Sequence, residues 1–188
     1  MKRTFAAAFP VTAPVLMGYL AIGMAFGLML QSIGYNVLWA FFMSLVIYAG
    51  SGQYLGVSLL ATGASLPQVA FLTLMVNFRH LVYGLSLIEK LRGMGLRKLY
   101  VIFALTDETY ALLSSAKPPQ GVRDHDFYFA VALLDHIYWI GGSVLGSLVG
   151  ADEMLLPALA VIVLGLTMLR PRLDDAFPKP GKKQEVRV

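Results

Sequence analysis

One stretch sets the main constraint on this chain, because the 75 consecutive residues 4–78 carry no formal charge. Of all 188 residues only 14% are charged and 57% are hydrophobic, whereas about 25% of the residues are charged in a soluble domain. A helix satisfies its own backbone hydrogen bonds in lipid, where water is absent. We therefore predict an all-α, polytopic membrane protein.

Apolar runs long enough to cross a membrane divide the chain. A helix needs about 20 residues to cross a hydrocarbon core roughly 30 Å thick. On this criterion we predict about six spans, at residues 10–30, 37–61, 67–88, 99–115, 127–150 and 155–169. The spans form a single transmembrane domain at 1–169, and the basic segment at 170–188 is expected to be a disordered tail.

The second of these runs contains a weak point for a helix. Gly50-Ser51-Gly52-Gln53 sets two glycines beside a serine and a glutamine, and glycine is a poor helix former. Non-helical backbone at membrane depth needs a cavity or protein cover. We expect a discontinuous second helix here, with Ser51 and Gln53 facing a cavity. The alternative is a continuous helix with a packing notch.

Short matches recur at an offset of 90 residues. Ile47-Tyr48 and Leu66-Pro67 reappear as Ile137-Tyr138 and Leu156-Pro157. If the first three spans correspond to the last three, the two halves have inverted topology. Such a 3+3 inverted repeat is typical of secondary transporters, whose substrate site lies at the midplane between the repeats.

The distribution of basic residues bears on orientation and partners. With six spans and a cytoplasmic N-terminus, four Lys and Arg lie on each side, apart from the six in the tail. The tail therefore decides the positive-inside count and places both termini in the cytoplasm. A re-entrant second segment would change the number of crossings and therefore the side of the membrane on which each later loop lies. The net charge of +4 lies mainly in the tail and one loop, which favours lipid head groups over nucleic acid as a partner.

An arginine interrupts the third span. A charge at the centre of a bilayer costs about 2.5 kcal/mol or more, so Arg79 is expected to have a ligand or a partner. The geometry of its guanidinium matches that of a carboxylate. We expect the guanidinium to lie in the dry middle of the protein and to bind an anionic group there. The alternative is that Arg79 pairs with Asp107 or Asp135 and only locks helices together.

Polar side chains around Arg79 extend this candidate site. On a helix, Asn77 and His80 lie on one stripe, and Arg79 and Tyr83 lie on an adjacent one. Backbone N–H groups at the break would help to bind a carboxylate. We assign substrate binding to the third span and to the break, that is to Arg79, Asn77, Tyr83, Gly50, Ser51, Gly52 and Gln53.

The fourth span contains two adjacent acidic residues. The side chains of Asp107 and Glu108 point about 100° apart on a helix, so both cannot face one partner. One is expected to meet Arg79, while the other binds an ammonium group or carries a proton. His80 is a candidate to relay that proton near neutral pH, although a lone histidine in an apolar run is more often a satisfied core residue.

Four further residues are secondary candidates. Thr106 and Tyr110, one turn apart, extend the polar face of the fourth span. Asp135 and His136 lie about two turns into the fifth span. We expect this pair near the lipid head groups, in a solvated role.

The sequence contains no motif of an enzyme or a metalloprotein. It has no HExxH, Walker loop or GxSxG pattern, no cysteine and three histidines. We expect no enzymatic activity, no cofactor and no metal site.

Three blocks of sequence resemble the AzlC family, the large subunits of branched-chain amino acid exporters. The blocks are Ile47-Tyr48-Ala49-Gly50-Ser51-Gly52-Gln53, Val76-Asn77-Phe78-Arg79-His80-Leu81-Val82-Tyr83-Gly84 and Leu105-Thr106-Asp107-Glu108-Thr109-Tyr110-Ala111. The resemblance implies export of valine, leucine, isoleucine or methionine across the bacterial cytoplasmic (inner) membrane. It also implies the proton gradient as energy source and a small membrane partner of the AzlD type.

These features favour a proton-coupled secondary exporter of small apolar amino acids, and two other classes stay open. A channel would use residues 50–53 as a pore-lining loop and would conduct without saturation. A non-transporting structural subunit would use Arg79 and Asp107 as a helix clamp and would bind no amino acid.

Overall fold

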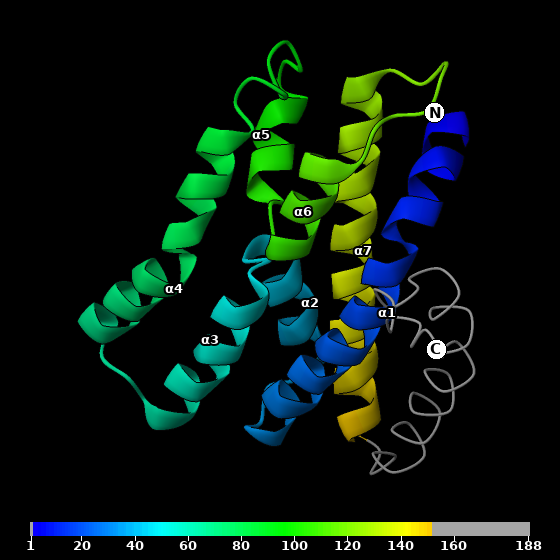
Figure 1. Cartoon of the computed structure of the whole chain (residues 1–188). Coiled ribbons are helices and arrows are strands. Elements are labelled where there is room, and N and C mark those ends of the chain that lie inside the picture. The colour runs from blue at the N-terminus through cyan, green and yellow to red at the C-terminus, as the bar shows by residue number, and fades with distance from the viewer. Residues whose placement is uncertain (1, 152–188) are drawn as a thin grey trace, which may run out of the picture.

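The structure, a computed structural model, describes residues 2–151, and every regular element in this range is a helix. The elements are α1 (Lys2–Ser32), α2 (Val37–Val46), α3 (Gly50–Thr62), α4 (Leu66–Ser86), α5 (Arg97–Phe103), α6 (Asp107–Ser115) and α7 (Asp124–Ala151) (Figure 1). The prediction of an all-α protein is confirmed. The predicted sixth span at 155–169 and the tail at 170–188 lie outside the described residues.

Three of the helices are long and apolar enough to cross a membrane. They are α1 with 31 residues, α4 with 21 and α7 with 28. α1 and α7 contain the first and fifth predicted spans, and α4 ends two residues before the predicted end of the third. α4 has no buried residue and exposes large apolar side chains, among them Phe71 and Leu85 at 62% and 68%. Such a surface is compatible with lipid, whose tails are as apolar as leucine.

The second predicted span does not pass through the molecule but folds back as a hairpin of α2 and α3. Met43 and Gly56 show this, because a Cβ on Gly56 would lie 3.6 Å from the Met43 methyl carbon. α2 has 10 residues and extends only about 15 Å, half of the hydrocarbon core. A discontinuous second helix is thus present, but its break lies at Ile47-Tyr48-Ala49, where Tyr48 has a φ of +40°. Residues 50–53 form the first turn of α3.

The fourth predicted span is also a hairpin, formed by α5 and α6, whose outer ends lie at the same end of the molecule. At the start of α5, Arg97 Nη1 lies 2.5 Å from Asp126 Oδ1 in the first turn of α7. Near the end of α6, the Leu113 carbonyl accepts a bond of 2.5 Å from Lys90 Nζ, which also lies 5.1 Å from the ring centre of Tyr128 in α7. The prediction of a single membrane crossing at residues 99–115 is therefore wrong.

The two hairpins enter from opposite ends and meet at mid-height (Figure 1). The chain repeats one pattern twice in opposite directions, a long helix followed by a short hairpin: α1 with α2–α3, and α4 with α5–α6. The predicted offset of 90 residues instead aligns the broken α2–α3 with the unbroken α7, and the described residues do not follow that register. Oppositely directed repeats with interrupted helices at a central site are a transporter architecture.

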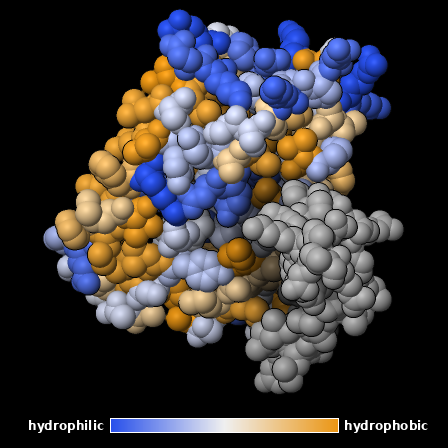
Figure 2. All heavy atoms as spheres, in the orientation of Figure 1, coloured by the Kyte–Doolittle hydropathy of each residue, from blue (hydrophilic) through white to orange (hydrophobic). Residues whose placement is uncertain are grey.

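Basic residues gather at one end of the described chain. Figure 2 shows hydrophilic residues at this end, above a largely hydrophobic body. The fold brings segments 89–98 and 117–123 together because α5–α6 turns back between them. Apart from Arg79, the described Lys and Arg all lie at this end, namely Lys2, Arg3, Lys90, Arg92, Arg97, Lys98, Lys117 and Arg123.

α1 and α7 pack closely through small residues. Gly27 of α1 lies against the Ser143–Ser147 turn of α7, and a Cβ on Gly146 would run into the backbone of Met24. Small residues permit this approach of two backbones. α7 also contacts α2, α5 and α6, while α1 contacts α3, so this pair of helices is the scaffold that positions both hairpins.

Candidate functional site

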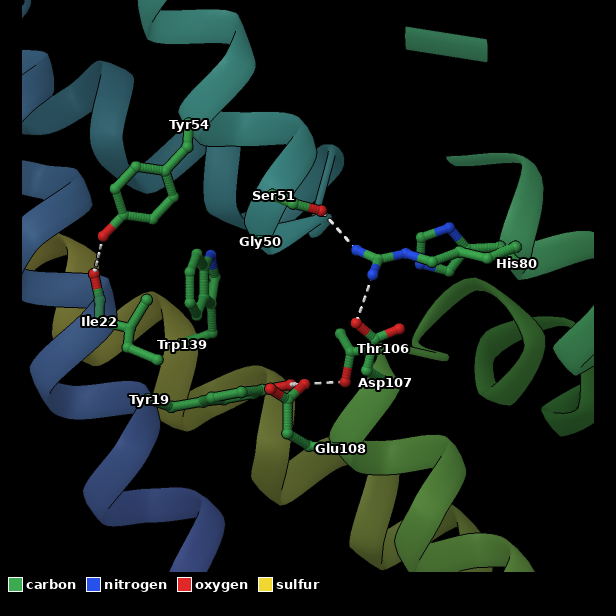
Figure 3. Close-up of a pocket in the computed structure, with 11 residues that line it drawn as sticks. Tyr19, Ile22, Gly50, Ser51, Tyr54, His80, Thr106, Asp107, Glu108 and Trp139 are labelled. Carbon is green, nitrogen blue, oxygen red and sulfur yellow. Dashed lines mark hydrogen bonds and ion pairs between the residues drawn. The ribbon is translucent and has the colours of Figure 1, made fainter. Parts of the chain in front are cut away.

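A cavity of about 430 Å³ lies where the two hairpins meet (Figure 3). Five helices and one helix cap supply its walls. The lining residues are Tyr19 and Ile22 of α1, Gly50, Ser51 and Tyr54 of α3, Arg79 and His80 of α4, Thr106 with Asp107 and Glu108 at the start of α6, and Trp139 of α7. Seven of these eleven residues were candidates from the sequence, and the fold brings them together from three distant segments.

Arg79 links the two hairpins across this cavity. Its Nη1 donates to Asp107 Oδ2 at 2.5 Å, and its Nη2 donates to Ser51 Oγ. One guanidinium therefore bridges the first turn of α3 and the first turn of α6 (Figure 3). The side chains of Arg79 and Asp107 are 39% and 43% exposed. The guanidinium thus lines a cavity and is not sealed inside the packed core, and a polar cavity lowers the cost of an ion at this depth.

Tyr83 holds Asp107 from its other side, and Tyr110 supports Tyr83. Tyr83 Oη donates to Asp107 Oδ1 at 2.7 Å, and the Tyr83 ring stacks on Tyr110 with ring centroids 4.4 Å apart. These tyrosines lie behind the cavity wall and position Asp107. His80 lines the cavity itself, and its Nδ1 lies 3.1 Å from the carbonyl oxygen of Asn77.

Glu108 points away from Arg79, as its place next to Asp107 requires. Its Oε2 accepts a bond of 2.9 Å from Tyr19 Oη. Within residues 2–151 no Lys, Arg or His forms an ion pair with Glu108, and no cluster of three or more His, Cys, Asp or Glu is arranged to hold a metal. Besides the imidazole of His80, the cavity therefore has one guanidinium and two carboxyl groups, of which only Asp107 is in an ion pair. This balance favours a bound cation such as an ammonium group.

The first turn of α3 presents backbone donors to the cavity. Its N-cap residue, Ala49, makes no side-chain capping bond, and Gly50 and Ser51 line the cavity. α6 differs, because the Thr106 side chain caps its first turn. The first N–H groups of a helix lack partners and carry partial positive charge. A carboxylate placed between Arg79 and the start of α3 would meet both kinds of donor.

The remaining wall is apolar and aromatic, and sequence reasoning missed it. Trp139 is 3% exposed and packs edge-on against Tyr19, with ring centroids 5.3 Å apart. Tyr54 Oη donates to the carbonyl oxygen of Ile22 at 2.6 Å. The sequence held one usable signal, the Tyr19 hydroxyl inside an apolar span. An isoleucine or a tryptophan in such a span does not indicate which cavity it will face.

Gln53 does not face the cavity, so that prediction is wrong. The side chain is fully buried; its Nε2 donates to Ser44 Oγ at 3.2 Å, and its Oε1 accepts from Trp139 Nε1 at 2.8 Å. Residues two apart on a helix point about 200° apart, so Ser51 and Gln53 cannot share one face. Gln53 instead ties α3 to α2 and α7.

Gly52 and Asn77 also lie outside the candidate site. A Cβ on Gly52 would be 3.3 Å from Asn77 Nδ2, so the glycine permits α3 and α4 to pack closely. Both residues line a second cavity of about 410 Å³, which is mostly apolar. Asn77 Oδ1 is buried there without a hydrogen-bond partner.

Asp135 and His136 lie in the core, and the expectation of a solvated position near the head groups is wrong. They are 0% and 4% exposed. The His136 nitrogens lie 3.1 Å from the Ser44 carbonyl oxygen and 2.9 Å from Tyr100 Oη, so His136 is a satisfied core histidine. α7 begins at Asp124, before the predicted span. Asp135 therefore lies about 16 Å along the helix, roughly half the hydrocarbon thickness.

Comparison with known proteins gives one consistent family. The family profile described as "AzlC protein" matches residues 14–152. An "Uncharacterized membrane protein" of Helicobacter pylori is 46% identical over 149 residues, 79% of this chain and 65% of that protein. The "Branched-chain amino acid transport protein AzlC" of Bacillus subtilis is 40% identical over 147 residues, 78% of this chain and 58% of that protein. The "Inner membrane protein YgaZ" of Escherichia coli is 28% identical over 179 residues, 94% of this chain and 72% of that protein.

The matched region contains every residue that lines the cavity. The chain spans 65% of the length of the Helicobacter relative and 58% of the Bacillus relative. No solved structure matches the chain.

Proposed function

This chain belongs to the AzlC family, and from that premise we propose that it exports valine, leucine, isoleucine and methionine. It is a multi-pass protein of the bacterial inner membrane. The Bacillus subtilis relative is named a branched-chain amino acid transport protein, which supports this choice of substrates. We further propose that the proton gradient drives export and that a small subunit of the AzlD type is needed for it.

The observation that carries the proposal is the arrangement of charge around the cavity. Arg79 and the first turn of α3 offer donors on one side, while Glu108 offers an unpaired carboxyl group on another. A free amino acid carries a carboxylate and an ammonium group, which match these two sides. Arginine has five N–H donors, and Asp107 and Ser51 occupy two of them, so further donors remain for a substrate carboxylate.

The apolar wall would select the side chain of the substrate. Ile22, Tyr54 and Trp139 line it beside the charged groups. Burying a Val, Leu, Ile or Met side chain contributes about 1.5–3 kcal/mol, whereas a polar side chain would lose hydrogen bonds to water there. The cavity volume of about 430 Å³ lies within the usual range for small-molecule sites.

The two hairpins offer a means of alternating access. Their turns meet at the cavity from opposite ends, and Arg79 holds them together through Ser51 and Asp107. A substrate carboxylate that takes donors from this guanidinium would weaken one of the two bonds. The corresponding hairpin would then move and open the cavity to one side of the membrane; in secondary transporters with inverted repeats, one repeat likewise moves against the other around the central site.

Counterflow in proteoliposomes tests the proposal. The full-length chain is reconstituted with its co-purified small subunit, the vesicles are loaded with unlabelled leucine, and uptake of labelled leucine is measured. We expect saturable counterflow. Conductance that does not saturate, without counterflow, would indicate a channel instead. Arg79→Gln should reduce counterflow at least tenfold, about 1.4 kcal/mol, whereas Arg92→Gln, in an exposed surface pair with Glu89, should not change it. Normal counterflow in Arg79→Gln would exclude the guanidinium from substrate binding.

One observation favours a second candidate, a structural membrane subunit without transport activity. The Arg79–Asp107 pair is the helix clamp that such a subunit would use. If the pair serves only as a clamp, the charge-swapped double variant Arg79→Asp/Asp107→Arg should assemble like the wild type. The wild type should also bind no leucine. Leucine binding by the wild type would exclude it.

A further inference from the structure

A chain of hydrogen bonds leads from the cavity to the buried carboxyl group of Asp135. Glu108 Oε2 accepts a bond of 2.9 Å from Tyr19 Oη, which in turn lies 2.5 Å from Thr106 Oγ1. Thr106 Oγ1 contacts Thr109 Oγ1 at 3.0 Å, and Thr109 Oγ1 contacts Asp135 Oδ2 at 2.8 Å. Residues of α1, α6 and α7 thus connect two carboxyl groups through three hydroxyl groups.

When both carboxyl groups are ionised, this series of hydrogen bonds has one hydrogen too few for its contacts. Five oxygens make four contacts, but only the three hydroxyl groups carry hydrogen when both carboxyl groups are ionised. In that state Tyr19 donates to Glu108, and the two threonines donate toward Asp135. No hydrogen then lies between Tyr19 and Thr106, where two lone pairs would face each other. One added proton supplies the missing hydrogen and satisfies all the contacts.

The surroundings of Asp135 also favour a proton. The side chain is fully buried, and its Oδ1 has no hydrogen-bond partner. Within residues 2–151 no Lys, Arg or His forms an ion pair with it, and neighbouring His136 turns both ring nitrogens to other partners. An unpaired buried carboxylate is costly. The titratable groups that face Asp135, none of them a cation, are Tyr19, Tyr48, Glu108 and Tyr138.

We propose that Asp135 and Glu108 bind one proton between them and that the three hydroxyl groups transfer it from one to the other. With the proton on Asp135, this group donates to Thr109 and each hydroxyl donates toward an ionised Glu108. With the proton on Glu108, every donor points the other way and Asp135 is ionised. Each hydroxyl oxygen accepts one hydrogen and releases one, so the transfer is balanced and needs no other reactant.

The position of the proton decides what the cavity can bind. Glu108 attracts an ammonium group only as a carboxylate, so a substrate and the proton cannot occupy Glu108 together. Binding of an amino acid therefore moves the proton to Asp135. This coupling rests on the proposed function, whereas the shared proton does not.

Infrared difference spectroscopy of the full-length protein in detergent tests the shared proton directly. A protonated carboxyl group has a carbonyl stretching band that ionised carboxylates lack. We expect one such band in the wild type at neutral pH and its loss in Asp135→Asn, because the amide supplies the fourth hydrogen in place of a proton. Asp126→Asn, on the same helix but outside the chain of hydrogen bonds, is the matched control and should keep the band. A wild type without the band, or a band that persists in Asp135→Asn, would overturn the proposal.

Two substitutions of Thr109 test the transfer. Valine keeps the shape of threonine without its hydroxyl group, whereas serine keeps the hydroxyl. Leucine should shift the carbonyl band in the wild type and in Thr109→Ser, but not in Thr109→Val. A leucine-induced shift of the same size in Thr109→Val would overturn the transfer. The band without any leucine counterflow would support the proton site and overturn the proposed function, so the two failures are distinguishable.

Discussion

Ser51 and Asp107, which are 56 residues apart in the sequence, bind the same guanidinium from two hairpins that enter from opposite ends. Neither helix is long enough to cross a membrane, since α3 has 13 residues and α6 has 9. Both helices therefore begin in the interior, where their first backbone and side-chain polar groups need partners. Arg79 supplies that polar cover, and the cavity beside it follows from the same interruption of two helices.

Ser51→Ala tests whether the α3 side of this bridge takes part in binding. The Ser51 hydroxyl accepts a hydrogen bond from Arg79, so the variant removes one of the two contacts that fix the guanidinium at the position where it would meet a substrate carboxylate. We expect the Kd for leucine to rise roughly tenfold, and Trp139 in the cavity wall provides a fluorescence signal for the titration. Ser58→Ala is the control on the same helix, because its hydroxyl bonds only to the Tyr54 carbonyl of α3. An unchanged Kd in Ser51→Ala would remove this residue from the site.

With two hairpins the positive-inside count no longer depends on the tail, whereas along six spans the Lys and Arg outside the tail divide four against four. Since the eight loop and terminal Lys and Arg lie at one end, the positive-inside rule places that end in the cytoplasm. The chain has no cysteine, so single-cysteine variants report accessibility cleanly. Ala64→Cys, between α3 and α4, should react with a membrane-impermeant maleimide in spheroplasts. Lys98→Cys should react only in inverted vesicles.

Six crossings predict the reverse of both results. In that topology residue 64 lies in the cytoplasm and residue 98 outside. The labelling therefore separates a hairpin from a crossing for the second and fourth segments together, independently of any transport activity.

The second segment illustrates which parts of the fold the sequence could predict. Its apolar run predicted a helix, and Gly50 and Gly52 predicted an interruption close to the observed one. An apolar run of this length looks the same, however, whether it passes through the membrane or turns back, because the outcome depends on what the turn contacts. Thr106, followed by two acidic residues, is a helix-start pattern. Considered only as part of a polar face, it did not reveal the second hairpin.

The candidate site, too, could be predicted from the sequence only in part. Arg79 was expected to meet either Asp107 or Asp135, and the structure gives the bond to Asp107. Charge in an apolar run made these residues conspicuous in the sequence. Ile22 and Trp139 face the cavity only because of how α1 and α7 are rotated about their axes. The glycine contacts between these two helices set that rotation, and it cannot be read from either helix alone.

The contact between α1 and α7 gives a test on stability. A Cβ on Gly146 would collide with the backbone of Met24, whereas a Cβ on Gly18 would meet nothing within 4 Å. Overpacking costs about 1–3 kcal/mol, so Gly146→Ala should lower the thermal unfolding midpoint in detergent. Gly18→Ala is the matched control and should leave the midpoint unchanged or raise it slightly, because alanine is the better helix former. Equal midpoints for the two variants would contradict the described packing.

Gln53 and Ser51 lie on one turn of α3 but on opposite faces, so substitutions there should separate stability from binding. Gln53→Leu leaves Trp139 Nε1 without its buried acceptor and Ser44 Oγ without its donor. An unsatisfied buried polar group costs about 1–3 kcal/mol, and the unfolding midpoint should fall accordingly. The Kd for leucine should stay within about twofold of the wild type, because Gln53 does not line the cavity.

Ser51→Ala should show the opposite pattern, with weaker leucine binding and little change in the midpoint, because Ser51 lines the cavity and water there can replace its hydroxyl as a partner of Arg79. The two variants serve as controls for each other under the same titration and the same thermal scan. If Gln53→Leu weakened leucine binding as strongly as Ser51→Ala while the midpoint stayed at the wild-type value, Gln53 would face the substrate. The rotation of α3 described here would then be wrong, and with it the assignment of the cavity wall to Gly50, Ser51 and Tyr54.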